Sequence, residues 1–179
     1  MPIRLLNILG LLGISAILIV AFFYQLVLGE LPCPLCLLQR GAFVALGLGF
    51  LLNIRFGSSA AHYGLIVVSA VIGAGTSLRQ VLLHILPGDP GYGSTFLGLH
   101  FYTWALVVFA GTILYAGLLL FLEADNPPSE PAPRPVDRLA AVSLWLFVLL
   151  VAGNLASTLL ECGVGPCADN PTVYDWLHF

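Results

Sequence analysis

Five long apolar stretches, separated by short polar segments, make up most of this chain. They cover residues 5–28, 37–54, 62–86, 96–122 and 139–160. A helix needs roughly 20 apolar residues to cross the hydrocarbon core of a bilayer, and each stretch reaches or approaches that length. The pattern therefore predicts five membrane-spanning helices that form a single transmembrane domain over residues 1–179.

Two of the connecting segments are rich in residues that interrupt helices. Residues 87–94 read PGDPGYGS, and residues 123–137 read EADNPPSEPAPRPVD. Proline lacks a backbone N–H group and cannot continue a helix, so we predict a loop and a polar linker here. The first apolar stretch is longer than the apolar core of a secretory signal peptide, which has about 7–15 residues, and we predict that it remains as a helix.

The amino-acid composition supports the membrane class. Of the 179 residues, 59% are hydrophobic and only 8% are charged, whereas an average soluble domain has about 25% charged residues. The predicted fold class is therefore an all-α integral membrane protein. The net charge is −3 and the chain contains no lysine, so no basic surface is available for nucleic acid.

The positions of the arginines predict the orientation of the chain in the membrane. Cytoplasmic loops carry an excess of Lys and Arg. With a cytoplasmic N-terminus, most of the arginines lie at cytoplasmic ends: Arg4, Arg55, Arg134 and Arg138. The other two, Arg40 and Arg79, then lie at the outer ends of their spans. Residues 29–36 and the tail 161–179 fall on the non-cytoplasmic side, and both contain cysteine pairs.

The first cysteine pair, Cys33 and Cys36, lies in LPCPLCLLQR at the entrance to the second span. A C-x-x-C spacing suits reversible redox chemistry. Because Pro34 suits the first helical position, we predict Cys33 as the N-cap and Cys36 in the first turn, where the helix dipole stabilises a thiolate. Arg40 lies one turn further on the same face and can stabilise a thiolate or the oxygen of an electron acceptor. Alternatively, Arg40 is an interface arginine whose side chain snorkels to water.

The second pair, Cys162 and Cys167, follows the fifth span in ECGVGPC. Disulfides persist on the non-cytoplasmic face of a bacterial membrane, and two dithiols there suggest a relay by thiol–disulfide exchange. Neither a dinucleotide-binding motif nor a haem-attachment motif is present, so a membrane quinone is the predicted electron acceptor. A zinc site with four cysteine ligands is the alternative that the spacing leaves open.

Three short segments resemble the bacterial disulfide bond formation protein B (DsbB) family. They are CPLCLLQR after the first span, SLRQVLLH at residues 77–84, and FLGLHFYTW at residues 96–104. The resemblance runs over residues 1–122 and implies a four-helix transmembrane bundle in the inner membrane, here with an added fifth helix. It further implies a thiol oxidase that reoxidises a periplasmic DsbA-like, thioredoxin-fold partner and passes electrons to ubiquinone or menaquinone.

The resemblance also implies roles for individual residues. Cys36 would face the quinone, while Cys33 would exchange with the second pair. Arg40 would bind the quinone, together with Arg79 and His84, and no metal belongs to the site.

The chain departs from the family pattern at the second pair, which in the better-known members lies between the third and fourth helices. A related alternative is a quinone reductase similar to vitamin K epoxide reductase, although in that family the C-x-x-C lies late in the chain. His84 and His100 lie near the outer boundary, where histidines either shuttle protons or form structural hydrogen bonds.

Overall fold

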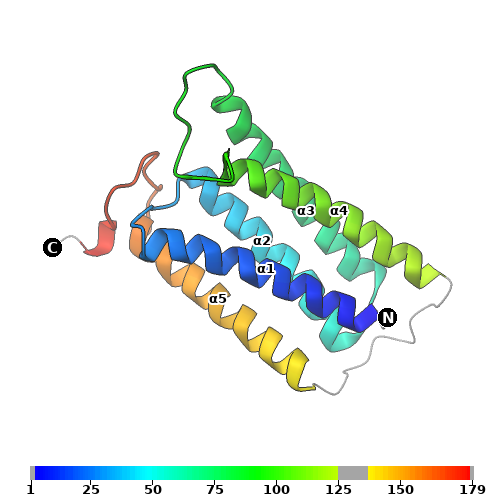
Figure 1. Cartoon of the computed structure of the whole chain (residues 1–179). Coiled ribbons are helices and arrows are strands. Elements are labelled where there is room, and N and C mark those ends of the chain that lie inside the picture. Colours follow the sequence, from blue (N-terminus) through cyan, green and yellow to red (C-terminus); the bar gives the residue numbers. More distant parts are fainter. Residues whose placement is uncertain (1–2, 125–136, 178–179) are drawn as a thin grey trace.

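The computed structural model describes residues 3–124 and 137–177, in which five long helices lie alternately up and down (Figure 1). They are α1 (Ile3–Leu26), α2 (Pro34–Phe56), α3 (Ala60–Leu83), α4 (Phe101–Ala124) and α5 (Arg138–Cys162). Each is long and apolar enough to cross a membrane. The predicted all-α membrane fold is confirmed, and most helix ends lie within a few residues of the predicted limits.

The predicted linker over residues 123–137 lies mostly outside the described residues, and Arg134 lies there too. At its two ends, α4 continues to Ala124 and Asp137 caps α5. Asp137 Oδ1 accepts a hydrogen bond from the Ala140 N–H group at 2.8 Å. This cap explains why α5 starts where the proline-rich segment stops, because the side chain satisfies an N–H group that has no partner within the helix.

The fourth helix begins at Phe101 rather than at residue 96. The preceding residues form a two-stranded antiparallel hairpin, β1 (Thr95–Phe96) and β2 (Leu99–His100). At its turn, Leu97 and Gly98 have φ values of 51° and 80°, which an α-helix cannot contain. The apolar composition of this segment did not reveal the turn, because a short apolar run fits a strand as well as a helix.

The core of the bundle lies between closely packed helices. The helix α3 packs against both α2 and α4, whereas α1 packs against α2 and α5. Small residues allow close approach: a Cβ atom at Gly47 of α2 would meet the ring of Phe147 of α5, and one at Gly73 of α3 would meet the ring of Phe109 of α4. Both rings are fully buried. Such contacts hold helices together where lipid removes the hydrophobic driving force.

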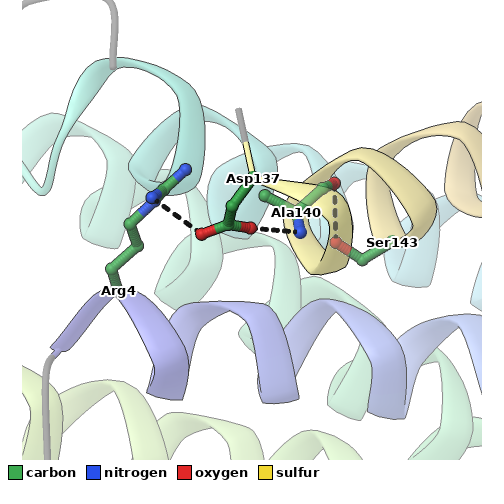
Figure 2. A network of polar contacts seen from close by, with 4 residues as sticks. All are labelled: Arg4, Asp137, Ala140 and Ser143. Atoms are coloured by element: carbon green, nitrogen blue, oxygen red, sulfur yellow. Dashed lines mark hydrogen bonds and ion pairs between the residues drawn. The ribbon is translucent and has the colours of Figure 1, made fainter. Parts of the chain in front are cut away.

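A polar contact ties the start of the added fifth helix to the first helix (Figure 2). Arg4 Nη1 donates to Asp137 Oδ2 at 3.2 Å. Asp137 caps α5 with its other oxygen, and the Ser143 hydroxyl donates to the Ala140 carbonyl within the first turns of α5. The ion pair therefore fixes α5 beside α1 at one end of the bundle.

Both cysteine pairs lie at the opposite end of the bundle. The chain enters α2 just after Cys33 and leaves α5 at Cys162, and Figure 1 places these two helix ends and the loop between α3 and α4 together. Because successive helices run in opposite directions, the start of α2 and the end of α5 lie at the same end of the bundle. The fold thus brings together the two parts of the sequence that carry cysteines, which are about 130 residues apart in the chain.

Candidate functional site

The first cysteine pair forms a disulfide at the N-terminus of α2. Cys33 is the N-cap, with φ −67° and ψ 163°, and its Sγ accepts a hydrogen bond from the Cys36 N–H group at 3.2 Å. Pro34 occupies the first turn, where its missing N–H group costs nothing. The predicted placement of both cysteines is confirmed. The free N–H groups and the dipole of α2 point at the sulfurs, which favours a thiolate when the pair is reduced.

A glutamine from α3 contacts both sulfurs of this pair. Gln80 is 1% exposed, and its Nε2 donates to Cys33 Sγ at 3.3 Å and lies 3.7 Å from Cys36 Sγ. Its Oε1 accepts from Gln39 Nε2 at 2.9 Å, which fixes the orientation of the amide. Sequence reasoning missed both glutamines. The available signal was a polar side chain inside a predicted span, which by default marks a functional site.

A pocket of about 360 Å³ opens beside the pair, between α1, α2 and α4. Most of its wall is apolar or aromatic. Its lining includes Ile17, Leu18, Val20, Ala21 and Tyr24 from α1, Phe43 from α2, and Phe101, Tyr102, Trp104, Ala105 and Val108 from α4. Cys36, Gln39 and Arg40 supply its polar atoms from α2, whereas Cys33 does not line it. An apolar cavity with a few convergent polar groups is typical of a small-molecule site.

Arg40 is bonded into the bundle instead of extending along the membrane boundary. Its Nη1 donates to Gln25 Oε1 at 2.6 Å, and its Nη2 donates to the Ala21 carbonyl at 3.2 Å. The guanidinium carbon lies 5.8 Å from the centre of the Phe22 ring. These contacts hold the cation on the pocket wall, one helical turn from Cys36. The pocket wall therefore carries a positive charge that is held in place by α1.

Gln25 connects Arg40 to the fifth helix and to the tail. Its Nε2 donates to Ser157 Oγ at 2.6 Å and to Tyr174 Oη at 3.1 Å. Because its Oε1 accepts from Arg40, the amide joins the pocket wall to α5. Gln25 is almost fully buried, and the sequence analysis did not single it out. A series of hydrogen bonds thus connects α2, which carries the first cysteine pair, to α5, which leads into the second pair.

The second cysteine pair closes a short turn at the end of α5. Cys162 is buried, Cys167 is half-buried, and the two form a disulfide. The tail after it folds back, and its short 3-10 helix η1 (Asp175–Leu177) packs on α5. At Gly163, which has φ 60°, an added Cβ atom would lie 2.7 Å from the Trp176 indole nitrogen. Glycine at this position therefore permits both the turn and the packing of the tail.

Glu161 directly precedes this pair and is 3% exposed. Within the part of the chain that the structure describes, neither carboxylate oxygen has a hydrogen-bond partner. The carboxylate interacts electrostatically with Arg40 and with Asp175. A buried carboxyl group without hydrogen bonds is costly in its ionised form. Sequence reasoning missed this residue, because a single acidic residue at the end of a span carries no signal that it will be buried.

Two loops close the same end of the bundle. The Tyr92 hydroxyl donates to the Leu31 carbonyl at 2.8 Å, while the Glu30 carboxylate accepts from both the N–H group and the hydroxyl of Ser94. Burial, followed by the negative charges of Glu161 and Glu30, raises the pKa of Tyr92 above its ordinary value. Tyr92 therefore remains a neutral donor at physiological pH and anchors one loop to the other.

The other two predicted binding residues, Arg79 and His84, are not among the described residues that line the pocket. Arg79 is exposed on α3 and is not among the described residues that line the pocket. His84 caps the C-terminus of α3, its Nδ1 lies 3.0 Å from Asp89 Oδ1, and its ring stacks on Tyr102, which does line the pocket. His100 stacks on the same tyrosine, with ring centres 5.1 Å apart. Both histidines thus contact an aromatic residue of the pocket wall, although neither is among the described residues that line the pocket.

Comparison with known proteins gives a family match over the first half of the chain. Residues 3–92 match the family model described as disulfide bond formation protein DsbB. This region contains α1 to α3 and the first cysteine pair. It ends before α4, so it is shorter than the resemblance over residues 1–122 that the sequence motifs suggested. The second pair, on α5 and the tail, lies outside it.

Several curated proteins match slightly less than half of the chain. Disulfide bond formation protein B of Xanthomonas euvesicatoria pv. vesicatoria is 42% identical over 86 residues, covering 45% of this chain and 50% of that protein. Its counterpart from Chromobacterium violaceum is 41% identical over 95 residues, covering 49% and 57%. That of Xylella fastidiosa is 40% identical over 83 residues, covering 44% and 48%. The chain spans about half the length of the curated relatives it matches. No solved structure matches it.

Proposed function

The chain belongs to the disulfide bond formation protein B family, and we propose that it is a multi-pass inner-membrane thiol oxidase that depends on a quinone. In this proposal it reoxidises a periplasmic DsbA-like partner with a thioredoxin fold and passes the electrons to ubiquinone or menaquinone. Electrons pass through the two disulfides of the chain in turn.

The observation that carries the proposal is a shared pocket wall. Cys36, which is half of a disulfide, and Arg40, a fixed cation, line the same apolar cavity. An apolar cavity suits a quinone ring with its isoprenoid chain, and a guanidinium supplies directed donors to a carbonyl oxygen that gains negative charge on reduction. When bound, a quinone supplies an acceptor for two electrons and two protons. Arg40 and the aromatic residues of α4 are the groups that would hold it.

The second pair is the proposed entry point for electrons. Thiol–disulfide exchange needs an accessible sulfur for the incoming thiolate. Cys162 is buried while Cys167 is half-buried, so the partner would attack Cys167. That attack breaks the Cys162–Cys167 bond and leaves, after the partner closes its own disulfide, two thiols on this chain. These thiols then reduce the Cys33–Cys36 disulfide.

Gln80 and the α2 N-terminus support the proposed chemistry at the first pair. A thiolate on either sulfur faces the Gln80 amide and the unpaired N–H groups of the first helical turn. Both contributions stabilise negative charge, so an attack on Cys33 releases Cys36 as a thiolate beside the pocket, and Cys33 leaves in turn when the second pair closes its disulfide. No further cofactor is needed in this proposal.

The proposed orientation follows from the arginine distribution. The N-terminus lies in the cytoplasm, and the end of the bundle that carries both disulfides faces the periplasm. That compartment is oxidising, which lets both disulfides persist between turnovers. It is also where a soluble dithiol partner can reach Cys167.

The direct test is quinone reduction by the purified full-length chain in lipid vesicles, with a reduced DsbA-like protein as electron donor. We expect loss of quinone absorbance, with one donor disulfide formed for each quinone reduced. Cys36→Ser should abolish the reaction. Cys167→Ser should block the protein donor while the pocket still binds quinone, measured by equilibrium binding. A donor that lacks its own two cysteines is the negative control.

Two results would contradict the proposal. One is an active Cys36→Ser protein, because the sulfur that lines the pocket would then be dispensable. The other is a Cys167→Ser protein that accepts electrons from the protein donor at the parent rate, because the second pair would then lie outside the electron path.

A further inference from the structure

The position of Glu161 calls for a chemical explanation. This carboxyl group is 3% exposed, belongs to the residue that directly precedes Cys162 at the end of α5, and has no hydrogen-bond partner among the described residues. A group buried in this way is stable only if it is neutral or if a nearby charge offsets it. The charges around it bear on this choice.

The charged and titratable groups that interact with Glu161 come from α2, from the tail and from the loop between α3 and α4. Arg40 of α2 attracts it, Asp175 of η1 repels it, and Tyr92 of the loop between α3 and α4 interacts with it. Tyr174 of the tail joins them through Arg40. Arg40 is the one cation among these groups, and its hydrogen bonds run to Gln25 and Ala21 of α1 and not to the carboxylate. The attraction between Arg40 and Glu161 therefore acts through space.

We propose that Glu161 is an internal proton acceptor for the second cysteine pair, and that its protonation leaves the charge of Arg40 available to the pocket. This inference rests on the proposed function and adds a proton path to it. The residue belongs to the fifth helix, outside the part of the chain that matches the family.

The step balances in atoms and electrons. The Cys162–Cys167 dithiol must lose a proton before one of its sulfurs can attack the Cys33–Cys36 disulfide, because the thiolate is the nucleophile. Glu161 takes that proton. One S–S bond forms in the second pair, one breaks in the first pair, and two electrons move to the first pair. The remaining thiol of the second pair closes the Cys162–Cys167 bond and displaces Cys33, which takes up the proton of that thiol. The proton held by Glu161 finally passes to Cys36, so two thiols are consumed and two are formed.

The charges of the two groups explain why one residue couples both sites. While Glu161 is ionised, its negative charge offsets part of the potential of Arg40. Once Glu161 carries a proton, the full charge of Arg40 acts on the pocket wall, where the Cys36 thiolate is about to form. Coulomb interactions are strong in such a weakly polar environment. Proton uptake at the second pair thus favours the anion at the first pair.

The test is the pH dependence of quinone reduction in the full-length protein, with the DsbA-like dithiol as donor. Glu161→Gln keeps the size of the side chain but cannot take a proton. Without a base, a thiol with an ordinary pKa of about 8.5 is only about 3% ionised at pH 7. We therefore expect Glu161→Gln to lower the rate at pH 7 by about 10- to 30-fold and to approach the parent rate above about pH 9, where the thiol ionises unaided.

Two further variants separate proton transfer from a structural effect. Glu161→Asp keeps a carboxyl group and should keep the parent's pH profile at a reduced rate. Asp169→Asn removes the same charge from an exposed residue just after Cys167, and it should leave both rate and profile unchanged. A loss that is equal at all pH values, or a Glu161→Gln protein that behaves like the parent, would overturn the inference.

A spectroscopic measurement keeps the inference testable if Glu161→Gln does not fold. Time-resolved infrared difference spectra of the parent, recorded while the first pair oxidises the second, should show a transient carboxylic-acid carbonyl band that shifts in Glu161→Asp. The absence of this band overturns the proton path alone. A parent protein that reduces no quinone in the same vesicles overturns the proposed function as well, so the two failures are distinguishable.

Discussion

Replacement of Arg40 by alanine is the perturbation that tests the pocket most directly. The guanidinium uses two of its five N–H donors in hydrogen bonds, at 2.6 Å to Gln25 and 3.2 Å to Ala21, which leaves donors for a ligand. A charge-assisted hydrogen bond is worth about 1.5–3 kcal/mol. Losing one to the quinone should therefore raise the apparent quinone KM by about 10- to 150-fold.

The assay is steady-state quinone reduction over a range of quinone concentrations, with helix content checked by circular dichroism. Arg40→Lys keeps the charge but not the planar fork of donors, so its KM should lie between those of the parent and Arg40→Ala. Arg55→Ala is the matched control, since Arg55 lies in the last turn of the same helix, at the other end of the bundle. It should leave the quinone KM unchanged.

Unchanged quinone KM and kcat in Arg40→Ala would refute this reasoning. Arg40 would then serve only to tie α2 to α1 through Gln25 and Ala21, and its variant would lose thermal stability without losing quinone affinity. A rise in KM without a change in helix content supports the ligand role.

Three other predictions concern the orientation in the membrane, the loop between α3 and α4, and the buried charges of Arg40 and Glu161. After reduction of intact cells, a membrane-impermeant thiol reagent should label both cysteine pairs; if one pair stays protected until the membrane is broken, the orientation is reversed or the span count is wrong. The Gly91 N–H group and then His84 lower the pKa of Asp89. The ionised carboxylate therefore stabilises the loop at pH values above the ordinary carboxyl pKa, and this stabilisation is lost as the pH falls below about 4. Hydrogen exchange over residues 84–93 should show this loss, and Asp89→Asn should remove its pH dependence. Finally, Arg40→Ala leaves Glu161 buried without its positive neighbour, so the thermal midpoint of Arg40→Ala/Glu161→Gln should exceed that of Arg40→Ala alone; an equal or lower midpoint means that the two charges are not coupled.

Several features could be predicted from the sequence because local chemistry dictates them. Apolar stretches of membrane-spanning length leave the backbone no alternative to a helix in lipid, so the five helices follow from composition and length. Pro34 after Cys33 placed the first pair at a helix N-terminus, since proline suits that position. The parity of the helices placed both cysteine pairs at one end. Arg40, four residues after Cys36, had to share its face of α2.

Other features depend on contacts between segments that are distant in the chain. The hairpin before α4 escaped prediction because Leu97 and Gly98 adopt left-handed backbone conformations that apolar composition does not encode. Arg79 and Gln80 are neighbours near the end of α3, and the sequence does not show which of them faces the site. The rotation of α3 exposes Arg79 and turns Gln80 toward the sulfurs. One residue along a helix changes direction by about 100°, so only the packing decides which side chain faces the site.

The sequence by itself determined the class of the protein, the number of spanning helices and the position of the redox pairs, because these depend on hydrophobicity and on backbone chemistry within single segments. Only the tertiary structure decided that Gln25 joins Arg40 to α5, and that Glu161 lies buried within reach of the charge of Arg40. These relations arise where α1, α2 and α5 pack together. The chemistry of a buried polar group depends on the partners that packing supplies, and no single segment contains them.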